Sequence, residues 1–399
     1  MTVPTSQLRA SFAATLSQMY GAEVPAYTTL VEVTSEVNRE CAGSDRLGSL
    51  ARVTAERHGA IRVGSAAELA DTADLFAAFG MFPVGFYDLR AAKSPVPVVS
   101  TAFRPIDPDE LDANPFRVFT SMLATADTRF FSAELRARVD HFVARRQLFD
   151  PALIAQARRI AADGCPRAEA GDFVRRAAAA FALSRDPIDK AWYDELSAVS
   201  AVAADIAGVR TTHINHLTPR VLDIDELYAR MTARGVTMIE AIQGPPRTTG
   251  PAVLLRQTSF RALAEPRRFR APDGTVFDGT LRVRFGEVEA RGVALTPAGR
   301  ARYDAAMTDP EHWDRYFPDD DTAMAAQGLA YYRGGDPTKP VVYEDFLPAS
   351  AAGIFRSNLD SDAAPVQISD ESGYSPDWMS GAIDHHIHDP YALYEKAAS

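Results

Sequence analysis

Two histidine-bearing runs and one later carboxylate-bearing run have the residue types that bind a metal ion. His58 opens the strand-like run RHGAIRVG, and His213 and His216 lie in a second run, THINHLT. Glu287 and Glu289 lie in a third run, RFGEVE. Two histidines and one carboxylate on rigid strands form a facial triad that binds iron(II) and leaves positions open for substrate and dioxygen. The pattern therefore favours a non-haem iron site of the kind that oxygenases use.

Strand geometry limits which of these side chains can share one metal ion. His213 and His216 are three residues apart, so on one strand they face opposite sides. Glu287 and Glu289 are two residues apart and face the same side, so spacing alone does not choose between them. We therefore expect His58 and His216 with one of the two glutamates, and His213 as a neighbour of the metal or the substrate.

Arg62, Tyr87 and Arg256 are further candidates for the same pocket. Arg62 follows His58 by four residues and shares its strand face, where a planar guanidinium would pair with a substrate carboxylate. Tyr87 and Arg256 lie on expected strands and could line the pocket. The C-terminal run DHHIH at 384–388 is interpreted as an exposed cluster without a metal, because adjacent histidines point apart.

Hydrophobic periodicity predicts two similar units of strand, helix and further strands. Helices are expected at 7–20 and 27–39 before the first unit. The first unit is expected to have strands at 58–63, 83–89 and 96–104 and a helix at 66–80. The second is expected to have strands at 212–217, 237–244, 252–260, 269–270 and 280–289 and a helix at 223–235. The Ala-, Arg- and Leu-rich stretch 113–207 predicts an all-helical insertion.

These elements predict an α+β protein with a core of two β-α-β-β(-β) units. The units are expected to form one curved mixed sheet, flanked by helices. The predicted parts are 1–110 (helices and first unit), 111–208 (helical insertion), 209–300 (second, metal-binding unit) and 301–399 (a C-terminal cover that contacts substrate).

Composition excludes several other classes of protein. A chain of 399 residues with 46% hydrophobic and 24% charged residues can bury a large core. A net charge of −11 argues against a nucleic-acid partner. Cys41 and Cys165 alone support neither a disulfide framework nor a thiolate metal site. No signal peptide or membrane span is expected, so we predict a cytoplasmic protein without a membrane partner.

Several longer motifs, in order, resemble the 2-oxoadipate dioxygenase/decarboxylase family of the vicinal oxygen chelate superfamily. They are ERHGAIR at 56–62, PFRVFTS at 115–121, HINHLTPR at 213–220, LLRQTSF at 254–260, FGE at 285–287 and the run at 343–359. The resemblance extends from about residue 6 to about residue 360. It implies an Fe(II)-dependent enzyme of lysine catabolism that converts 2-oxoadipate and dioxygen to 2-hydroxyglutarate and carbon dioxide.

Motif by motif, the resemblance also implies roles for single residues. The implied iron ligands are His58, His216 and Glu287. The implied substrate contacts are Arg62, Ala349 and Ser350, and Glu289 is left as a neighbour of the metal ligands.

Two alternatives remain open from the sequence. Family members often carry valine where this chain has Ala349, and one methylene in a hydrophobic pocket changes selectivity by about 1–3 kcal/mol. The resemblance also implies that the chain is shorter than typical members after residue 360. One alternative is thus an oxygenase for a different 2-oxo acid in a specialised pathway, or an extradiol-type dioxygenase. The other is a binding protein without catalysis. The oligomeric state is left open.

Overall fold

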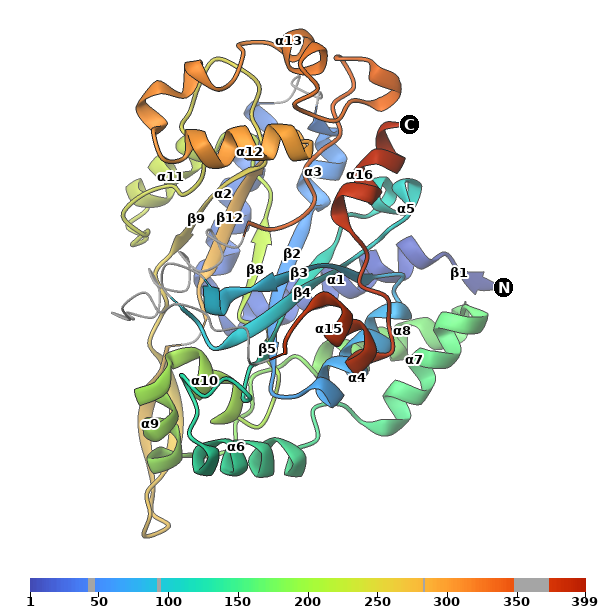
Figure 1. The fold of residues 1–399 in the computed structure, drawn as a ribbon. Helices are drawn as coiled ribbons and strands as arrows, with labels where there is room; N and C mark the ends of the chain where they lie inside the picture. The colour runs from blue at the N-terminus through green and yellow to red at the C-terminus, as the bar shows by residue number, and fades with distance from the viewer. Residues whose placement is uncertain (42–46, 92–94, 283, 348–372) are drawn as a thin grey trace.

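A mixed β-sheet runs through the centre of the protein, and helices pack around it (Figure 1). The structure, a computed structural model, describes residues 1–41, 47–91, 95–282, 284–347 and 373–399. Five strands pair in the order Phe82–Asp88 (β3), Val98–Arg104 (β4), Arg117–Leu123 (β5), Arg57–Val63 (β2) and His216–Pro219 (β8). β2 and β5 run parallel, and the other neighbours run antiparallel. The predicted α+β class with a curved mixed sheet is confirmed.

The first half of the sheet is one β-α-β-β-β unit. β2 leads into helix α4 (Ala66–Ala77), and β3, β4 and β5 follow along the chain. The N-cap Ser65 of α4 accepts a hydrogen bond from the Glu68 amide, which fixes where the helix begins. β5 then returns to pair with β2, and this pairing places Arg117 opposite His58.

The second unit also opens with a strand followed by a helix, and it lies against the first. β8 leads into α11 (Ile224–Ala233), and β9 (Leu255–Phe260) and β12 (Gly286–Arg291) follow. β12 pairs antiparallel with β9 and lies parallel beside β8, where the amide of Val221 donates to the carbonyl of Glu289. The two units therefore meet at their opening strands, β2 and β8.

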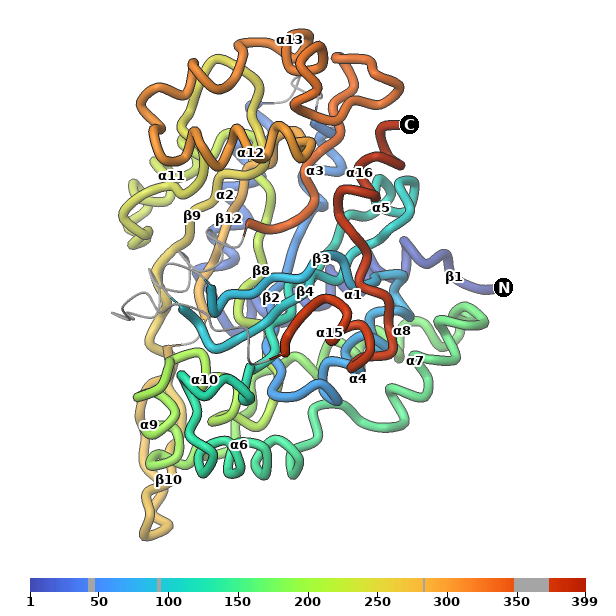
Figure 2. The backbone as a smooth tube through the Cα atoms, viewed as in Figure 1, coloured from blue at the N-terminus to red at the C-terminus, as the bar shows by residue number. Residues whose placement is uncertain are grey.

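A hairpin separates β9 from β12 in the chain. Its strands β10 (Glu265–Arg270) and β11 (Val276–Leu281) pair antiparallel and project away from the body of the protein (Figure 2). β10 also pairs with the two-residue strand β7 (Ile188–Asp189).

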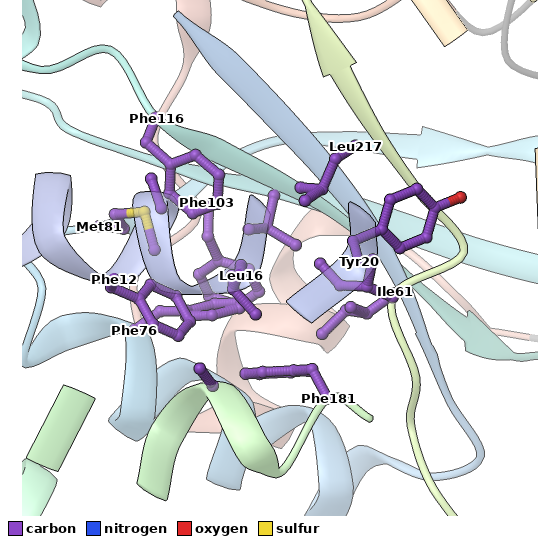
Figure 3. Packing of buried hydrophobic residues seen from close by; sticks show 14 of the residues in the cluster. Phe12, Leu16, Tyr20, Ile61, Phe76, Met81, Phe103, Phe116, Phe181 and Leu217 are labelled. Carbon is purple, nitrogen blue, oxygen red and sulfur yellow. The ribbon is translucent and has the colours of Figure 1, made fainter. Parts of the chain in front are cut away.

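N-terminal helices cover one face of the sheet. They are α1 (Thr5–Glu23), α2 (Pro25–Glu40) and α3 (Leu50–Ala55), so the helices expected at 7–20 and 27–39 are confirmed. α1 buries a stripe of apolar side chains at Leu8, Phe12, Leu16 and Tyr20. Phe12 stacks on Phe79 with ring centroids 4.2 Å apart. Figure 3 shows Phe12 and Leu16 among aromatic and aliphatic side chains of the sheet and its helices.

The chain between the two units is mostly helical. Its helices are α6 (Ala133–Arg145), α7 (Pro151–Asp163), α8 (Arg167–Ala179), α9 (Lys190–Val199) and α10 (Ala201–Ala207), while the short helix α5 (Pro108–Ala113) lies between β4 and β5 inside the first unit. The two-residue strands β1 (Thr2–Val3) and β6 (Cys165–Pro166) pair beside α8. The prediction of an all-helical stretch is wrong at its start, because β5 is a buried strand inside the sheet. β5 extends the first unit to Leu123, beyond the predicted boundary at residue 110, and the predicted division into parts otherwise stays a prediction.

The C-terminal part forms two groups of helices. α12 (Pro297–Ala306) and α13 (Asp321–Ala326) lie at one end of the protein, and α15 (Pro376–Ile383) packs on α4 (Figure 1). α16 (Pro390–Ala398) ends the chain. Between α15 and α16, His388 exchanges backbone hydrogen bonds with the edge strand β3, donating to Pro83 and accepting from Gly85.

Three expected strands of the second unit differ from the structure. The run 212–217 is a strand only from His216, because the amide of Ile214 donates to Phe181 instead of to a strand. The run 237–244 forms only isolated bridges to β9. The run 280–289 is divided between β11 and β12, because Arg284 turns between them to pair with Glu265.

The described helices include none that is both long and apolar enough to span a membrane.

We predict that Phe12→Ala lowers the free energy of unfolding by about 3–5 kcal/mol, because it leaves a cavity in a fully buried aromatic cluster. Urea denaturation followed by circular dichroism measures this change. Ser11→Ala, on the exposed face of the same helix, is the control and should change stability by less than about 0.5 kcal/mol. Equal effects of the two substitutions would contradict this account of the core.

Candidate metal centre

Three buried side chains from three neighbouring strands converge on one point of the sheet. His58 on β2, His216 on β8 and Glu287 on β12 each offer one ligand atom, and these atoms lie within 4.8 Å of one another. Nε2 of His58 lies 3.9 Å from Oε1 of Glu287, and Nδ1 of His216 lies 3.5 Å from Oε2. Within the described residues, no other such group of histidine, cysteine or acidic side chains is present.

The register of two strands explains why the histidines meet. β2 and β8 pair antiparallel, with Ala60 opposite His216 and Thr218 opposite His58. Residues directly opposite in a sheet share a face, and so do residues two apart on one strand. Both imidazoles therefore lie on one face, and β12 beside β8 adds Glu287 to it.

Neighbouring groups fix the orientation of each imidazole ring. Nδ1 of His58 lies 3.2 Å from Oε1 of Glu289, and the Phe346 ring meets the His58 ring edge-on at 4.9 Å. Nδ1 of His216 lies 3.0 Å from the Thr218 hydroxyl. A carboxylate at one ring nitrogen sets the tautomer, so Glu289 at Nδ1 leaves Nε2 of His58, which faces Glu287, to bind a metal ion.

The electrostatics of the three groups suit a cation. Burial lowers the pKa of His58, and burial together with His58 lowers the pKa of His216 well below its usual value, so both rings keep neutral donor nitrogens. Burial and the nearby Glu289 carboxylate raise the pKa of Glu287 well above its usual value. A divalent cation between the three side chains would compensate the buried charge of Glu287. The residues therefore fit a hard or borderline metal ion with open positions.

Glu289 has different neighbours from Glu287, although both point to the same face as the parity argument predicted. Nε and Nη2 of Arg291 donate to Glu289 at 2.6 and 2.9 Å, and Nη2 of Arg117 lies 3.5 Å away. Burial opposes ionisation of Glu289, but Arg291 and the other cations hold its pKa well below the usual value. Glu289 is thus an ionised partner of His58, held by arginines.

Arg62 lies beyond the histidines in a second buried cluster. Its Nη1 donates to Asp205 on α10, which also accepts a hydrogen bond of 2.9 Å from the Asn215 amide. Nε2 of His213 lies 3.1 Å from Oδ1 of Asp205. The structure thus places His213 in the Arg62 cluster and outside the trio of His58, His216 and Glu287.

The other predicted pocket residues lie in different places. Tyr87 reaches the site indirectly, because its hydroxyl accepts a hydrogen bond of 3.4 Å from the amide of Phe346. Arg256 points to the opposite face of β9 from Gln257 and pairs with Asp225 on α11 at 2.6 and 3.0 Å. Arg256 is therefore not brought together with the trio. Ala349 and Ser350 lie outside the described residues.

Several residues around the trio were missed by the reasoning from sequence. Asp205 is an isolated acid in an alanine-rich helix, and no feature of the nearby sequence indicates that it pairs with Arg62. Arg117 lies in the quoted motif PFRVFTS, but nothing in the sequence indicated that it lies beside Glu289. The importance of Thr218 follows only from the pairing of β8 with β2. Phe346 is far from His58 in the sequence and contacts it only in the folded protein.

Two buried histidines and one buried glutamate on a mixed sheet identify this protein as a candidate metalloenzyme. Residues 12–358 match the family described as 2-oxoadipate dioxygenase/decarboxylase, and the chain belongs to this family. The family resemblance predicted from the motifs is confirmed.

Two curated relatives and one solved structure support this assignment. The chain is 71% identical to 2-oxoadipate dioxygenase/decarboxylase of Mycobacterium tuberculosis over 402 residues, covering 99% of this chain and 97% of the relative. It is 39% identical to the Pseudomonas putida enzyme of the same name over 453 residues, covering 99% and 95%. The structure of hydroxyglutarate synthase from Pseudomonas putida in complex with 2-oxoadipate matches with a TM-score of 0.84 and 36% identity, covering 100% of this chain and 96% of that one.

We predict that Glu287→Ala abolishes metal binding, because it removes one of the three expected ligands, while Glu289→Ala still binds metal. Glu289→Ala should weaken metal affinity or activity by roughly 10- to 100-fold, as loss of a partner that orients a ligand histidine does. Metal content after desalting and titration with Fe(II) under anaerobic conditions measure both. Equal retention of metal by the two variants would show that Glu287 is not a ligand.

Proposed function

We propose that this protein is an Fe(II)-dependent dioxygenase/decarboxylase that converts 2-oxoadipate and dioxygen to 2-hydroxyglutarate and carbon dioxide in lysine catabolism. The observation that carries the proposal is the buried trio of His58, His216 and Glu287 in a chain that belongs to this family. A relative of 36% identity forms a complex with 2-oxoadipate, which supports a 2-oxo dicarboxylic acid as the substrate.

His58, His216 and Glu287 would hold Fe(II) through two imidazole nitrogens and one carboxylate. Bound Fe(II) would supply binding of the 2-oxo acid and activation of dioxygen. His58 and His216 stay neutral in their buried positions, and Glu287 offsets part of the charge of the ion. The rings of Phe346 and Phe285 lie 4.9 Å from the rings of His58 and His216 respectively, and they exclude water from this side.

Arg62 would bind a carboxylate of the substrate. It lies on the same face of β2 as His58, four residues further along, and is buried. Asp205 and its partners Asn215 and His213 hold the guanidinium in place. Arg62 and the bound metal ion would give the pocket positive charge for the proposed dianionic substrate.

The proposal requires a fixed stoichiometry. One 2-oxoadipate and one dioxygen contain the same atoms as one 2-hydroxyglutarate and one carbon dioxide, so no second 2-oxo acid is consumed. We predict that the Fe(II)-loaded protein takes up oxygen and releases carbon dioxide and 2-hydroxyglutarate in equal amounts. An oxygen electrode and mass spectrometry of the products measure this.

A substrate panel is the control for this assay. Turnover of a different 2-oxo acid with iron bound would support the oxygenase assignment but show that 2-oxoadipate is not the substrate. Ring opening of catechols without turnover of 2-oxoadipate would point to an extradiol-type enzyme. Iron binding without turnover of any of these compounds would refute the proposed reaction.

We predict that Arg62→Ala raises the KM for 2-oxoadipate by about 10- to 100-fold, since a hydrogen bond to a charged group contributes about 1.5–3 kcal/mol. Metal content should not change, because Arg62 is not a ligand. Steady-state kinetics and iron analysis measure the two effects. Arg256→Ala is the matched control, because it removes an ion-paired arginine from the other face of the second unit. An unchanged KM in Arg62→Ala would rule out this role.

A further inference from the structure

A short segment, residues 343–346, lies between the metal centre and the C-terminal helix α16. The ring of Phe346 contacts His58, with centroids 4.9 Å apart. The carboxylate of Glu344 accepts a hydrogen bond of 2.5 Å from Nη1 of Arg117, the arginine that lies opposite His58 on β5. Glu344 is nearly fully buried, so its contacts hold this segment against the sheet.

The backbone of the 343–346 segment is bound to the same site. Nη1 of Arg291 donates to the carbonyls of Tyr343 and Asp345 at 2.8 and 3.0 Å. The other nitrogens of Arg291 hold Glu289, the carboxylate beside His58. The position of the segment therefore affects both the ring that packs on His58 and the arginine that orients Glu289.

Tyr394 of α16 holds the segment from its other side. The Tyr394 hydroxyl accepts a hydrogen bond of 2.8 Å from the amide of Glu344 and donates one to the carboxylate of Asp345. Asp345 is also held by Nε of Arg104 at 2.7 Å. Tyr394 and Asp345 are both buried, so water does not replace this bridge.

We infer that Tyr394 is a positioning residue for the metal centre, although it lies on the last helix of the chain. Its hydroxyl fixes the 343–346 segment, and the segment fixes His58 through Phe346 and Glu289 through Arg291. This inference goes beyond the proposed function, and it rests on the proposed metal site but not on the identity of the substrate.

The hydroxyl and the ring of Tyr394 have separable roles. The ring packs near Tyr331 and Tyr343, with centroids 5.8 and 6.2 Å away, and phenylalanine would keep that packing. Phenylalanine would leave the Glu344 amide without its acceptor and Asp345 without one donor. Tyr394→Phe therefore tests the bridge while α16 keeps its apolar contacts.

The experiment compares Co(II) binding by the full-length wild-type protein, Tyr394→Phe and a matched control. Tyr332→Phe is the control, because it removes a buried tyrosine hydroxyl that donates 2.8 Å to Asp321 in the same hydrophobic cluster. Co(II) affinity is measured by competition with a chelator, the environment of the ion by its visible absorption spectrum, and folding by thermal denaturation.

We expect Tyr394→Phe to bind Co(II) roughly 3- to 10-fold more weakly, less than the 10- to 100-fold typical of direct partners of ligands, and to shift the absorption bands. Tyr332→Phe should lose comparable thermal stability with wild-type Co(II) affinity and spectrum. If Tyr394→Phe does not fold, Asp345→Asn weakens the same bridge and is measured in the same way.

Each outcome decides the inference. Wild-type affinity and spectrum in a folded Tyr394→Phe or Asp345→Asn would overturn it, and so would equal losses in Tyr394→Phe and Tyr332→Phe. Wild-type protein that binds no Co(II) would overturn the metal site and the inference with it. Because the readout uses no substrate, failure to turn over 2-oxoadipate would count against the proposed function alone.

Discussion

The antiparallel pairing of β2 with β8 is the contact on which the site depends. Each strand opens one of the two repeated units, and their pairing brings His58 and His216 to one face. A slip of one residue in this pairing would move one histidine out of register and turn its strand over. Tyr20 stabilises the junction from α1, because its hydroxyl lies 3.0 Å from the carbonyl of Asn215 and 2.7 Å from that of Phe285, just before β8 and β12. The N-terminal helix thus fixes where two ligand-bearing strands begin.

Placing carboxylates at the centre of a sheet requires buried cations, and four arginines supply them. Burial would raise the pKa of Glu56, but Arg220 and Arg117 outweigh it and lower the pKa to about 2. The cluster contains Arg52, Arg117, Arg220 and Arg291 against Glu56, Glu289 and Glu344. Removing one partner of a buried ion pair lowers the free energy of unfolding by about 3–5 kcal/mol, so every member of the cluster is needed for stability. Among the described residues the ion pairs of this cluster do not include Glu287, whose charged neighbours are His58 and His216, and this leaves its carboxylate for the proposed metal ion.

Local periodicity was sufficient to predict the helices and most strands of the first unit, and with the motifs it was sufficient to predict the trio. It failed where pairing over long distances decides the structure. β5 has buried residues throughout, so its sequence has no alternating pattern to distinguish it from the helices that follow. Strand parity correctly placed Glu287 and Glu289 on one face but could not distinguish them, because the difference between them comes from Arg291 and Arg117. Asp205 could not be assigned to Arg62 without knowing that α10 lies against β2.

His58 at the candidate metal centre and Arg62 at the proposed substrate site lie on the same strand, β2. His58 and Arg62 are four positions apart on β2, which corresponds to about 13 Å between their backbones. Both side chains point to the same face, so a dicarboxylate lying along the strand can meet the metal ion at one end and a guanidinium at the other. A rigid strand keeps this separation constant, while loops would not. In the proposed function, this fixed separation, with the Arg62 guanidinium held by Asp205, would favour 2-oxo acids of one chain length.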